Sequence, residues 1–196
     1  IMLCICLLLC LLPTTVGAAA TGDCGSGVTW RLDEEATLTI SGTGAMTAYE
    51  NAEETPWYAN AGTILKVVVE PGVTRVGDCA FTCCHALNTV VLSEGLESIG
   101  ANAFYDCYEL ENISLPCSLK SIERNAFGGC IALTAVTLPE GLLTLGESAF
   151  TSSGLTSIAL PENLTSIGES VFFNCFRLKQ AAIPETLTDL PGGLFY

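Results

Sequence analysis

Apolar residues recur along most of this chain with a period of 22 or 23 residues. Within residues 110–130 they fall at positions 0, 3, 5, 9, 12, 16, 17 and 20 counted from Leu110, and the residues between them are mostly small or polar. The same pattern starts at residues 64, 87, 110, 133, 155 and 178, and the last copy is incomplete. Units of this length cannot bury an apolar edge alone, so the repeat predicts a solenoid of about six stacked coils. Positions within each coil are numbered below from these starts.

The first six positions of each coil predict a strand. Residues 133–138 alternate between apolar and polar side chains, and a proline at position 6 follows as Pro116, Pro139, Pro161 and Pro184. We expect these strands to stack in parallel about 4.8 Å apart, with positions 3 and 5 facing the core. Position 17 is phenylalanine in every coil, which predicts a stacked row of rings inside the solenoid. The L-x-x-L-x-L spacing is typical of leucine-rich repeats, so the fold class is a β-rich repeat solenoid.

Residues 21–63 lie outside the repeat and predict an N-terminal β cap. Residues 28–32 and 37–41 alternate with period two and are joined by four residues, which indicates a hairpin. A solenoid end needs its apolar cross-section covered, so we expect Trp30, Ile40 and Trp57 to pack toward the first coil. The alternative is a separate carbohydrate-binding module that stacks sugars on Trp30, Trp57 and Tyr58.

Residues 1–20 have the pattern of a signal peptide. Residues 1–12 are almost wholly apolar, a run too short to span a bilayer, and Ala18, Ala19 and Ala20 offer a cleavage site. No basic residue precedes the run, and the sequence begins at Ile1 rather than at methionine. This pattern predicts a secreted or cell-surface protein with no membrane span after the signal is removed.

The charge balance excludes two classes of partner. The chain has 21 acidic and seven basic residues, a formal net charge of -14. Nucleic-acid binding requires clustered lysine and arginine, and binding to anionic lipid requires a basic stripe. The sequence has neither, so we expect no nucleic-acid partner.

The repeats resemble the BspA-like leucine-rich repeats of bacterial surface proteins. The resemblance rests on coils such as LTSIALPENLTSIGESVFFNC at residues 155–175 and covers residues 64–196. The stretch from Val28 to Tyr58 also resembles the region that often introduces such repeats in secreted proteins of gut bacteria. The resemblance implies a secreted or surface-exposed binding protein, in some cases an adhesin for host matrix proteins or other cells.

The sequence offers no convincing catalytic or cofactor site. His85 is the single histidine and stands beside Cys84, but adjacent residues rarely converge as a nucleophile and its base. The hydrolase motif G-x-S-x-G, the zinc motif H-E-x-x-H and the phosphate-binding P-loop are absent from the sequence. We therefore predict no enzymatic activity and no cofactor.

The cysteines and a row of glutamates are the candidate metal ligands of the sequence. Cys84, Cys107, Cys130 and Cys175 share position 20, a single row that makes a poor zinc tetrahedron, and we expect small buried hydrophobes that form no continuous disulfide ladder. Four other cysteines are better disulfide candidates in an exported protein: Cys24, Cys79, Cys83 and Cys117. The acids at position 7 lack the accompanying Asp and Asn of a calcium site, so we predict no metal. They are Glu94, Glu140, Glu162 and Glu185.

Two surfaces are candidates for binding a partner. Strand positions 1, 2 and 4 form a neutral face rich in Thr and Ser, which includes Thr134, Thr137 and Thr156. That face lacks the aromatic and arginine anchors that concentrate binding energy. The loops at positions 18 to 22 carry such anchors. They are Tyr105, Tyr108, Phe173 and Phe176. We favour Tyr105 and Tyr108, because the two phenylalanines can instead fill space beside small neighbours.

The leading hypothesis is a non-catalytic module that binds a protein or cell-surface glycan, in adhesion for example. The alternative is a structural stalk, or the N-terminal recognition part of a larger secreted enzyme cut off after Tyr196. A solenoid that ends without a polar closing segment exposes a strand edge, so self-association through the C-terminal edge is also expected.

Overall fold

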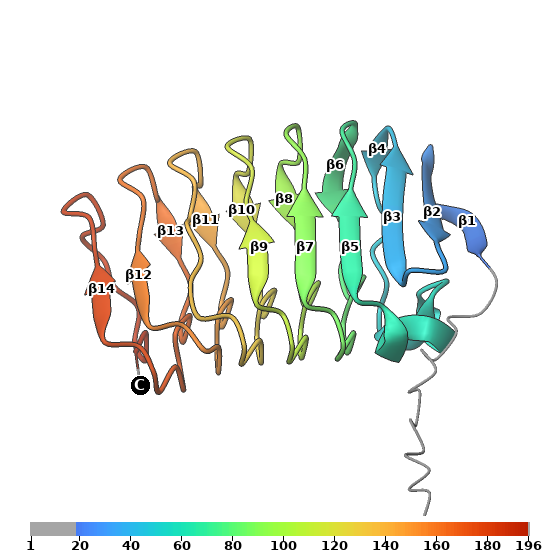
Figure 1. The fold of residues 1–196 in the computed structure, drawn as a ribbon. Helices are drawn as coiled ribbons and strands as arrows, with labels where there is room; N and C mark the ends of the chain where they lie inside the picture. The colour runs from blue at the N-terminus through green and yellow to red at the C-terminus, as the bar shows by residue number, and fades with distance from the viewer. Residues whose placement is uncertain (1–18, 196) are drawn as a thin grey trace, which may run out of the picture.

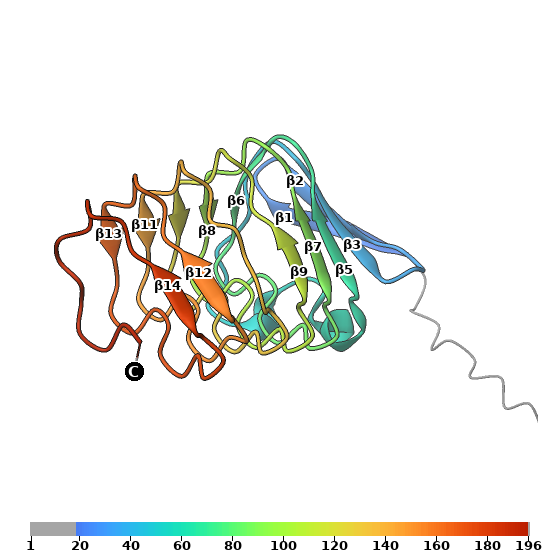
Figure 2. The ribbon, with the colours of Figure 1, turned by 60° about the vertical axis from the view of Figure 1, so that its left-hand side comes forward.

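The computed structural model describes residues 19–195, which form a solenoid of coils stacked along one axis (Figure 1). The predicted fold class is confirmed. Each coil runs through a first sheet, turns, returns through a second sheet and then closes through a loop. The two sheets face each other across the core (Figure 2). The predicted signal peptide falls on residues that lie, except for the last two, outside the described part of the chain.

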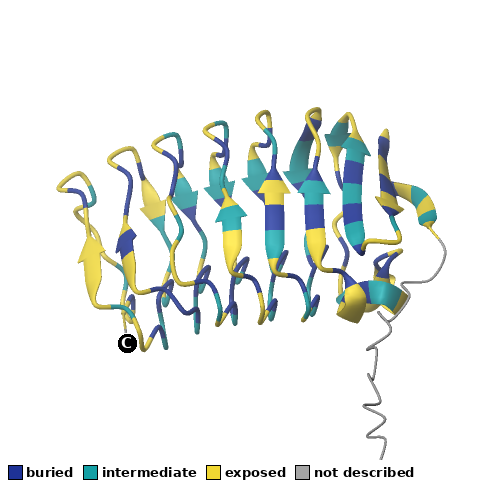
Figure 3. Ribbon diagram, viewed as in Figure 1, coloured by how far each residue is buried: buried dark blue, intermediate teal, exposed yellow. Residues whose placement is uncertain are grey.

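The first sheet combines the cap with the predicted coil strands. Its order is β1 (Ala20–Gly25), β2 (Val28–Leu32), β3 (Thr37–Gly42), β5 (Lys66–Val69), β7 (Thr89–Leu92) and β9 (Asn112–Ser114). The cap strands pair antiparallel, and every pair from β3 onward is parallel. Further along the solenoid, β12 (Ser157–Ala159) pairs in parallel with β14 (Gln180–Ala182). Positions 3 and 5 are buried in the first two coils, as the alternation predicts (Figure 3).

The second sheet was not predicted from the sequence. It contains β4 (Gly44–Ala45), β6 (Val73–Val76), β8 (Ser98–Ile99), β10 (Ser121–Ile122), β11 (Thr144–Leu145) and β13 (Ser166–Ile167). Four of these strands cover only positions 11 and 12, too short for alternation to reveal a strand. Their isoleucine or leucine at position 12 faces the core, which the pattern did indicate.

A third hydrogen-bonded side closes each coil. Residues at positions 15 and 19 have a left-handed backbone, as at Asn102 (φ 54°) and Asp106 (φ 58°), and these positions hold Asn, Asp, Ser, Gly or Cys. Short polar side chains and glycine tolerate this conformation best. Between them the phenylalanine amide donates to the next coil, as in Phe104 N–H to the carbonyl oxygen of Ala126 at 2.8 Å. Coils are therefore joined on three sides.

The core is organised by one row of aromatic rings. Phe81, Phe104, Phe127 and Phe150 are fully buried and stack with centroids 5.2 to 5.3 Å apart. Phe172 and Phe195 continue the row at 6.0 and 5.5 Å. The predicted row of rings at position 17 is confirmed.

The N-terminal segment covers the first coil as predicted. It ends in two short 3-10 helices, η1 (Ala52–Glu54) and η2 (Tyr58–Thr63). Trp57 is buried, stacks on Phe81 at 5.6 Å and donates its indole N–H to the carbonyl oxygen of Ala80 at 2.9 Å. The alternative sugar platform is wrong, because Trp30 is buried as well and only Tyr58 of the three is exposed.

Glycine at position 13 marks a close approach between coils. A Cβ built on Gly146 would lie 2.5 Å from the backbone nitrogen of Arg124 in the preceding coil. The third coil has Glu123 at this position, and its carboxylate accepts from the Arg75 guanidinium two coils away, with Nη2 to Oε2 at 3.1 Å. Arg75 also pairs with Asp78 of its own coil and donates to the hydroxyl group of Ser98 in the second coil at 3.2 Å, so this one charged group bridges three coils.

The fourth coil departs from the prediction. Residues 133–138, which alternate well in sequence, form no strand, and within residues 19–195 no backbone hydrogen bond joins residues 135–138 to β9. Proline contributes to the loss of this strand. In the second coil the Ser93 N–H group at position 6 donates to the carbonyl oxygen of Val69. Pro116 and Pro139 occupy position 6 in the next two coils and have no N–H group to make this bond. The fourth coil is also the one that is a residue shorter. We call the boundary between β9 and residues 135–138 the seam. Three apolar side chains beside it are only half-buried: Ile113, Leu115 and Val136.

Candidate partner-binding surface

The loops at positions 18 to 22 lie along one side of the solenoid, which we call the loop edge: residues 82–86, 105–109, 128–132, 151–154 and 173–177. It follows the third hydrogen-bonded side and forms the lower edge in Figure 1. Because the coils are in register, equal positions form rows that run along the solenoid axis.

Position 21 is the most exposed apolar row of the loop edge. Tyr108, Ile131 and Phe176 are 38%, 55% and 90% exposed. His85 precedes them in the row, and its ring stacks on the Tyr108 ring with centroids 4.8 Å apart and an interplanar angle of 4°. His85, Tyr108 and Ile131 hold the same position in three successive coils, so the register of the repeat puts them next to one another along the axis as a patch.

The side chains at position 18 are less exposed than those at position 21. Tyr105 and Phe173 are half-buried. The Tyr105 ring lies over Gly128 of the next coil, where a Cβ would come within 2.9 Å of it. Of the four predicted aromatic residues, Phe176 is therefore almost fully exposed, Tyr108 is exposed at 38%, and Tyr105 and Phe173 are half-buried.

Sequence reasoning missed two residues of this surface. Ile131 is not aromatic, so a criterion of aromatic anchors does not include it, and from sequence His85 is considered only as a partner of Cys84. Their common position with Tyr108 was visible in the repeat, and comparing rows rather than single loops would have found them.

The charge around Tyr108 is acidic. Asp106 and Glu109 are the charged residues of the loop edge in the first four coils, and no ion pair within the described residues involves them. The Asp106 carboxylate raises the pKa of the Tyr108 phenol, which remains protonated at neutral pH. The patch thus combines flat apolar side chains with two uncompensated carboxylates.

The strand face is accessible but offers weaker anchors. Thr134, Thr137 and Thr156 are all exposed on it, and the hydroxyl group of Thr156 donates to the carbonyl oxygen of Thr134 at 3.2 Å. Two shallow hollows of about 340 and 480 Å³ meet at the seam beside β9. Their walls are mostly Thr, Ser, Ala and aliphatic side chains, and Glu111 is the one charged residue among those that line them.

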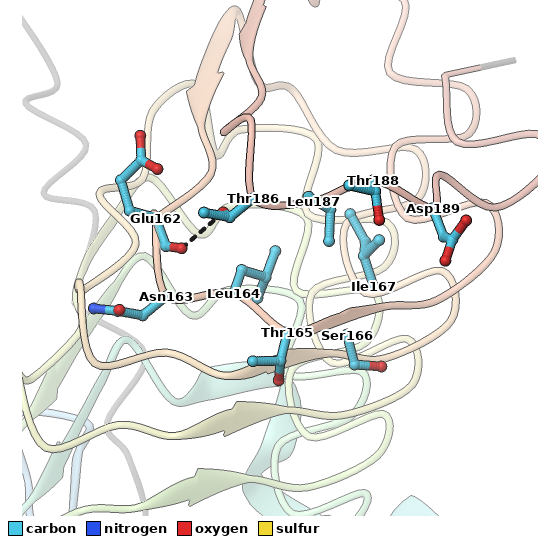
Figure 4. A pocket seen from close by; sticks show the side chains of 10 residues that line it. All are labelled: Glu162, Asn163, Leu164, Thr165, Ser166, Ile167, Thr186, Leu187, Thr188 and Asp189. Atoms are coloured by element: carbon cyan, nitrogen blue, oxygen red, sulfur yellow. Dashed lines mark hydrogen bonds between the residues drawn. The ribbon is translucent and has the colours of Figure 1, made fainter.

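The largest of the hollows described here, about 560 Å³, lies between the last two coils (Figure 4). Its walls are one backbone segment from each of these coils, residues 162–167 and 186–189. The Thr186 hydroxyl group links the two segments by donating to the carbonyl oxygen of Glu162 at 2.9 Å. The second sheet ends at β13 in the fifth coil. No strand of this sheet therefore joins the fifth coil to the sixth, and the hollow lies between these two coils. Strand β14 at this end is fully exposed (Figure 3).

The eight cysteines of residues 19–195 are all free thiols. The proposed disulfides of Cys24, Cys79, Cys83 and Cys117 are therefore wrong for this structure. Cys79 and Cys83 occupy the left-handed positions 15 and 19, Cys24 is buried in β1, and Cys117 is exposed on a turn after the first sheet. Cys24 therefore lies in the cap, Cys79 and Cys83 lie on the third side of the first coil, and Cys117 lies at a turn of the third coil.

The cysteine row at position 20 is buried, as predicted. Each thiol of Cys107, Cys130 and Cys175 donates to the phenylalanine carbonyl oxygen of the preceding coil at 3.1 to 3.2 Å. Burial raises the pKa of Cys84 to about 12 and raises those of the other three. Such thiols are poor nucleophiles at neutral pH, and His85 stacks on Tyr108 at the surface while Cys84 is buried.

Alkylation should separate these thiols. With iodoacetamide at neutral pH we expect Cys117 to react first, Cys83 more slowly, and the position 20 row to react only after urea unfolding, because thiolate and access are both required. Mass spectrometry of tryptic peptides measures the order. Rapid labelling of Cys107 or Cys130 in the native protein would contradict the buried row, and a bridge between any two cysteines would contradict the free thiols.

The row of acids at position 7 follows the turns after the first sheet. Glu94 accepts from the backbone N–H groups of Cys117 and Ser118 in the next coil at 2.9 and 3.2 Å. In the part of the chain from residue 19 to 195, no three His, Cys, Asp or Glu side chains gather as a metal would require. A search of the same residues finds no helix long and apolar enough to span a bilayer.

Comparison with known proteins places the coils in context. A family model described as a BspA type leucine rich repeat region matches residues 74–196 in six copies. No curated protein matches the sequence.

Several solved structures are similar. A leucine-rich repeat protein from Eubacterium ventriosum is 27% identical with a TM-score of 0.80, over 87% of this chain and 45% of its own. One from Bacteroides ovatus is 27% identical with a TM-score of 0.61, over 82% of this chain and 40% of its own. The T. pallidum leucine-rich repeat protein is 26% identical with a TM-score of 0.62, over 83% and 72%. The chain thus spans less than half the length of the first two.

Proposed function

Because the chain belongs to the BspA type leucine-rich repeat family, we propose that it is a secreted or cell-surface module that binds another protein through its loop edge. The observation that carries the proposal is the patch of His85, Tyr108 and Ile131, where three successive coils present adjoining apolar side chains at the surface. Binding energy concentrates on large side chains that a partner can desolvate. The apolar start of the sequence and the resemblance to adhesins support an exported role in adhesion.

Catalysis has no part in the proposal. The module instead works as a rigid support, because hydrogen bonds on three sides and the ring stack hold neighbouring loops in register. A rigid surface loses little conformational entropy on binding.

The test compares the two candidate surfaces. Purified extracellular-matrix proteins are passed over the immobilised chain in surface plasmon resonance, beside a glycan array for carbohydrate ligands. We expect saturable binding of a protein, weakened about tenfold or more by Tyr108→Ala with Ile131→Ala, since truncated anchors cost 1 to 2 kcal/mol or more.

The matched control is Thr134→Arg with Thr156→Arg on the strand face, with folding checked by circular dichroism. It should leave affinity within about twofold, as expected of a surface outside the contact. Loss of binding in the arginine variant and not in the edge variant would move the site to the strand face. Hits on glycans alone, or on nothing, would refute a protein-binding module.

A further inference from the structure

The patch on the loop edge has a chemical character that narrows its partner. Its flat part is the His85 and Tyr108 rings, parallel at 4.8 Å, with the Ile131 side chain beside them one coil further on. Its charged part is Asp106 and Glu109, which flank Tyr108 in the same loop.

Neither carboxylate forms an ion pair with another of the described residues. The ion pairs of the described residues are those of Arg75, which lies on the second sheet. Across residues 82–86, 105–109, 128–132 and 151–154 the sequence contains no lysine or arginine. His85 is thus the one basic side chain of these four loops, and no lysine or arginine within them neutralises Asp106 and Glu109.

We infer that the loop edge recognises a protein segment that presents an arginine next to an aliphatic residue. This rests on the proposed function and names the partner's chemistry. The guanidinium plane packs on the part of the Tyr108 ring that the His85 ring leaves uncovered, its N–H groups donate to the Asp106 and Glu109 carboxylates, and the aliphatic neighbour covers Ile131. Arginine suits the site better than lysine, because its planar fork both stacks on an aromatic face and pairs with carboxylates.

The geometry of the loop holds these groups in place. Asp106 has a left-handed backbone, and its amide donates to the carbonyl oxygen of Gly128 at 2.8 Å. Tyr108 N–H donates to the carbonyl oxygen of Asp106 at 3.0 Å, so the carboxylate and the ring are fixed within one tight turn. A Cβ on Gly129 would collide with the Asp106 carboxylate, so the glycine leaves room for that side chain over the next coil.

The experiment titrates the chain with three capped pentapeptides, Ala-Leu-Arg-Leu-Ala and the same peptide with citrulline or glutamate in the centre. Citrulline keeps the shape of arginine and removes its charge. Nuclear magnetic resonance of the Tyr and Ile side chains measures the affinity. We expect the arginine peptide to shift the Tyr108 and Ile131 signals and the citrulline peptide to bind at least about fivefold more weakly, as loss of the cation from an aromatic and acidic site implies.

Two double variants remove equal charge at opposite edges. Asp106→Asn with Glu109→Gln should reduce binding of the arginine peptide at least about threefold, the worth of partly exposed charge pairs. Asparagine tolerates the left-handed position, so the fold is preserved. Glu140→Gln with Glu162→Gln, on the turns after the first sheet, should leave it unchanged.

Equal affinity of the arginine and citrulline peptides, or equal weakening by both double variants, would overturn the inference. The outcome is separable from that of the proposed function. A protein partner that is lost with Tyr108→Ala and Ile131→Ala but unaffected by Asp106→Asn and Glu109→Gln docks at this edge without a basic anchor.

Discussion

Replacement of Phe127 by alanine is expected to lower the free energy of unfolding by about 3 to 5 kcal/mol, the cost of removing a fully buried phenylalanine. Phe127 lies at the middle of the row, between Phe104 at 5.3 Å and Phe150 at 5.2 Å. Its amide and its ring both join the coils, so the cavity would separate surfaces that stack on each other. Urea unfolding followed by circular dichroism measures the change.

Ile131→Ala is the matched control for this variant, since it lies in the same coil and is exposed. It should change stability by no more than about 0.5 kcal/mol. Phe127→Leu, which keeps most of the apolar volume, should fall between the two. A loss below about 1 kcal/mol in Phe127→Ala would mean that the row of rings does not hold the coils together.

Replacement of Trp57 by alanine should destabilise the protein by a similar amount, about 3 to 5 kcal/mol, because it removes a buried tryptophan. Trp57 begins the ring row on Phe81 and also meets Trp30 and Tyr49 edge to face at 5.8 and 6.2 Å. It is the aromatic contact between the cap and the first ring of the row, beside the strand pairs β3–β5 and β4–β6, so its loss leaves a cavity at that end of the core. The measurement is again urea unfolding.

Trp57→Phe separates the two roles of this side chain. It keeps a ring on Phe81 but leaves the Ala80 carbonyl group without the indole donor, at a cost of about 1 to 3 kcal/mol for the unpaired group and the smaller ring. Trp57→Ala with wild-type stability would show that the segment before residue 64 does not act as a cap.

Much of the fold is predictable from the repeat alone. The positions of Val67, Phe104 and Leu142 in the core follow from period and hydrophobicity, because each coil buries the same positions against the next. The second sheet is less visible, since strands such as Ser121–Ile122 are fixed by partners 23 residues away and not by local alternation. The prediction of a strand at residues 133–138 is wrong for the same reason. A strand needs a paired neighbour, and an alternating pattern within the segment does not supply one.

The candidate surface was only partly predictable. Tyr108 could be identified because it is a large aromatic residue at a loop position of the repeat. The partial burial of Tyr105 could not, because it depends on the contact of its ring with Gly128 in the next coil. The pairing of His85 with Tyr108 is a contact between coils, and the left-handed backbone of Cys79 and Cys83 was not evident from the repeat. Side-chain relations between coils thus require the structure.

The central claim is that the loop edge, and not the strand face, contacts the partner. Cross-saturation in nuclear magnetic resonance tests it directly. The bound matrix protein is irradiated, and the loss of signal is recorded on this chain at the Tyr108 ring and at the methyl groups of Ile131, Thr134, Thr137 and Thr156. If the loop edge is the site, the Ile131 methyl groups and the Tyr108 ring lose intensity while the three threonines keep theirs. Intensity lost from Thr134, Thr137 and Thr156, with Ile131 unaffected, would contradict the claim.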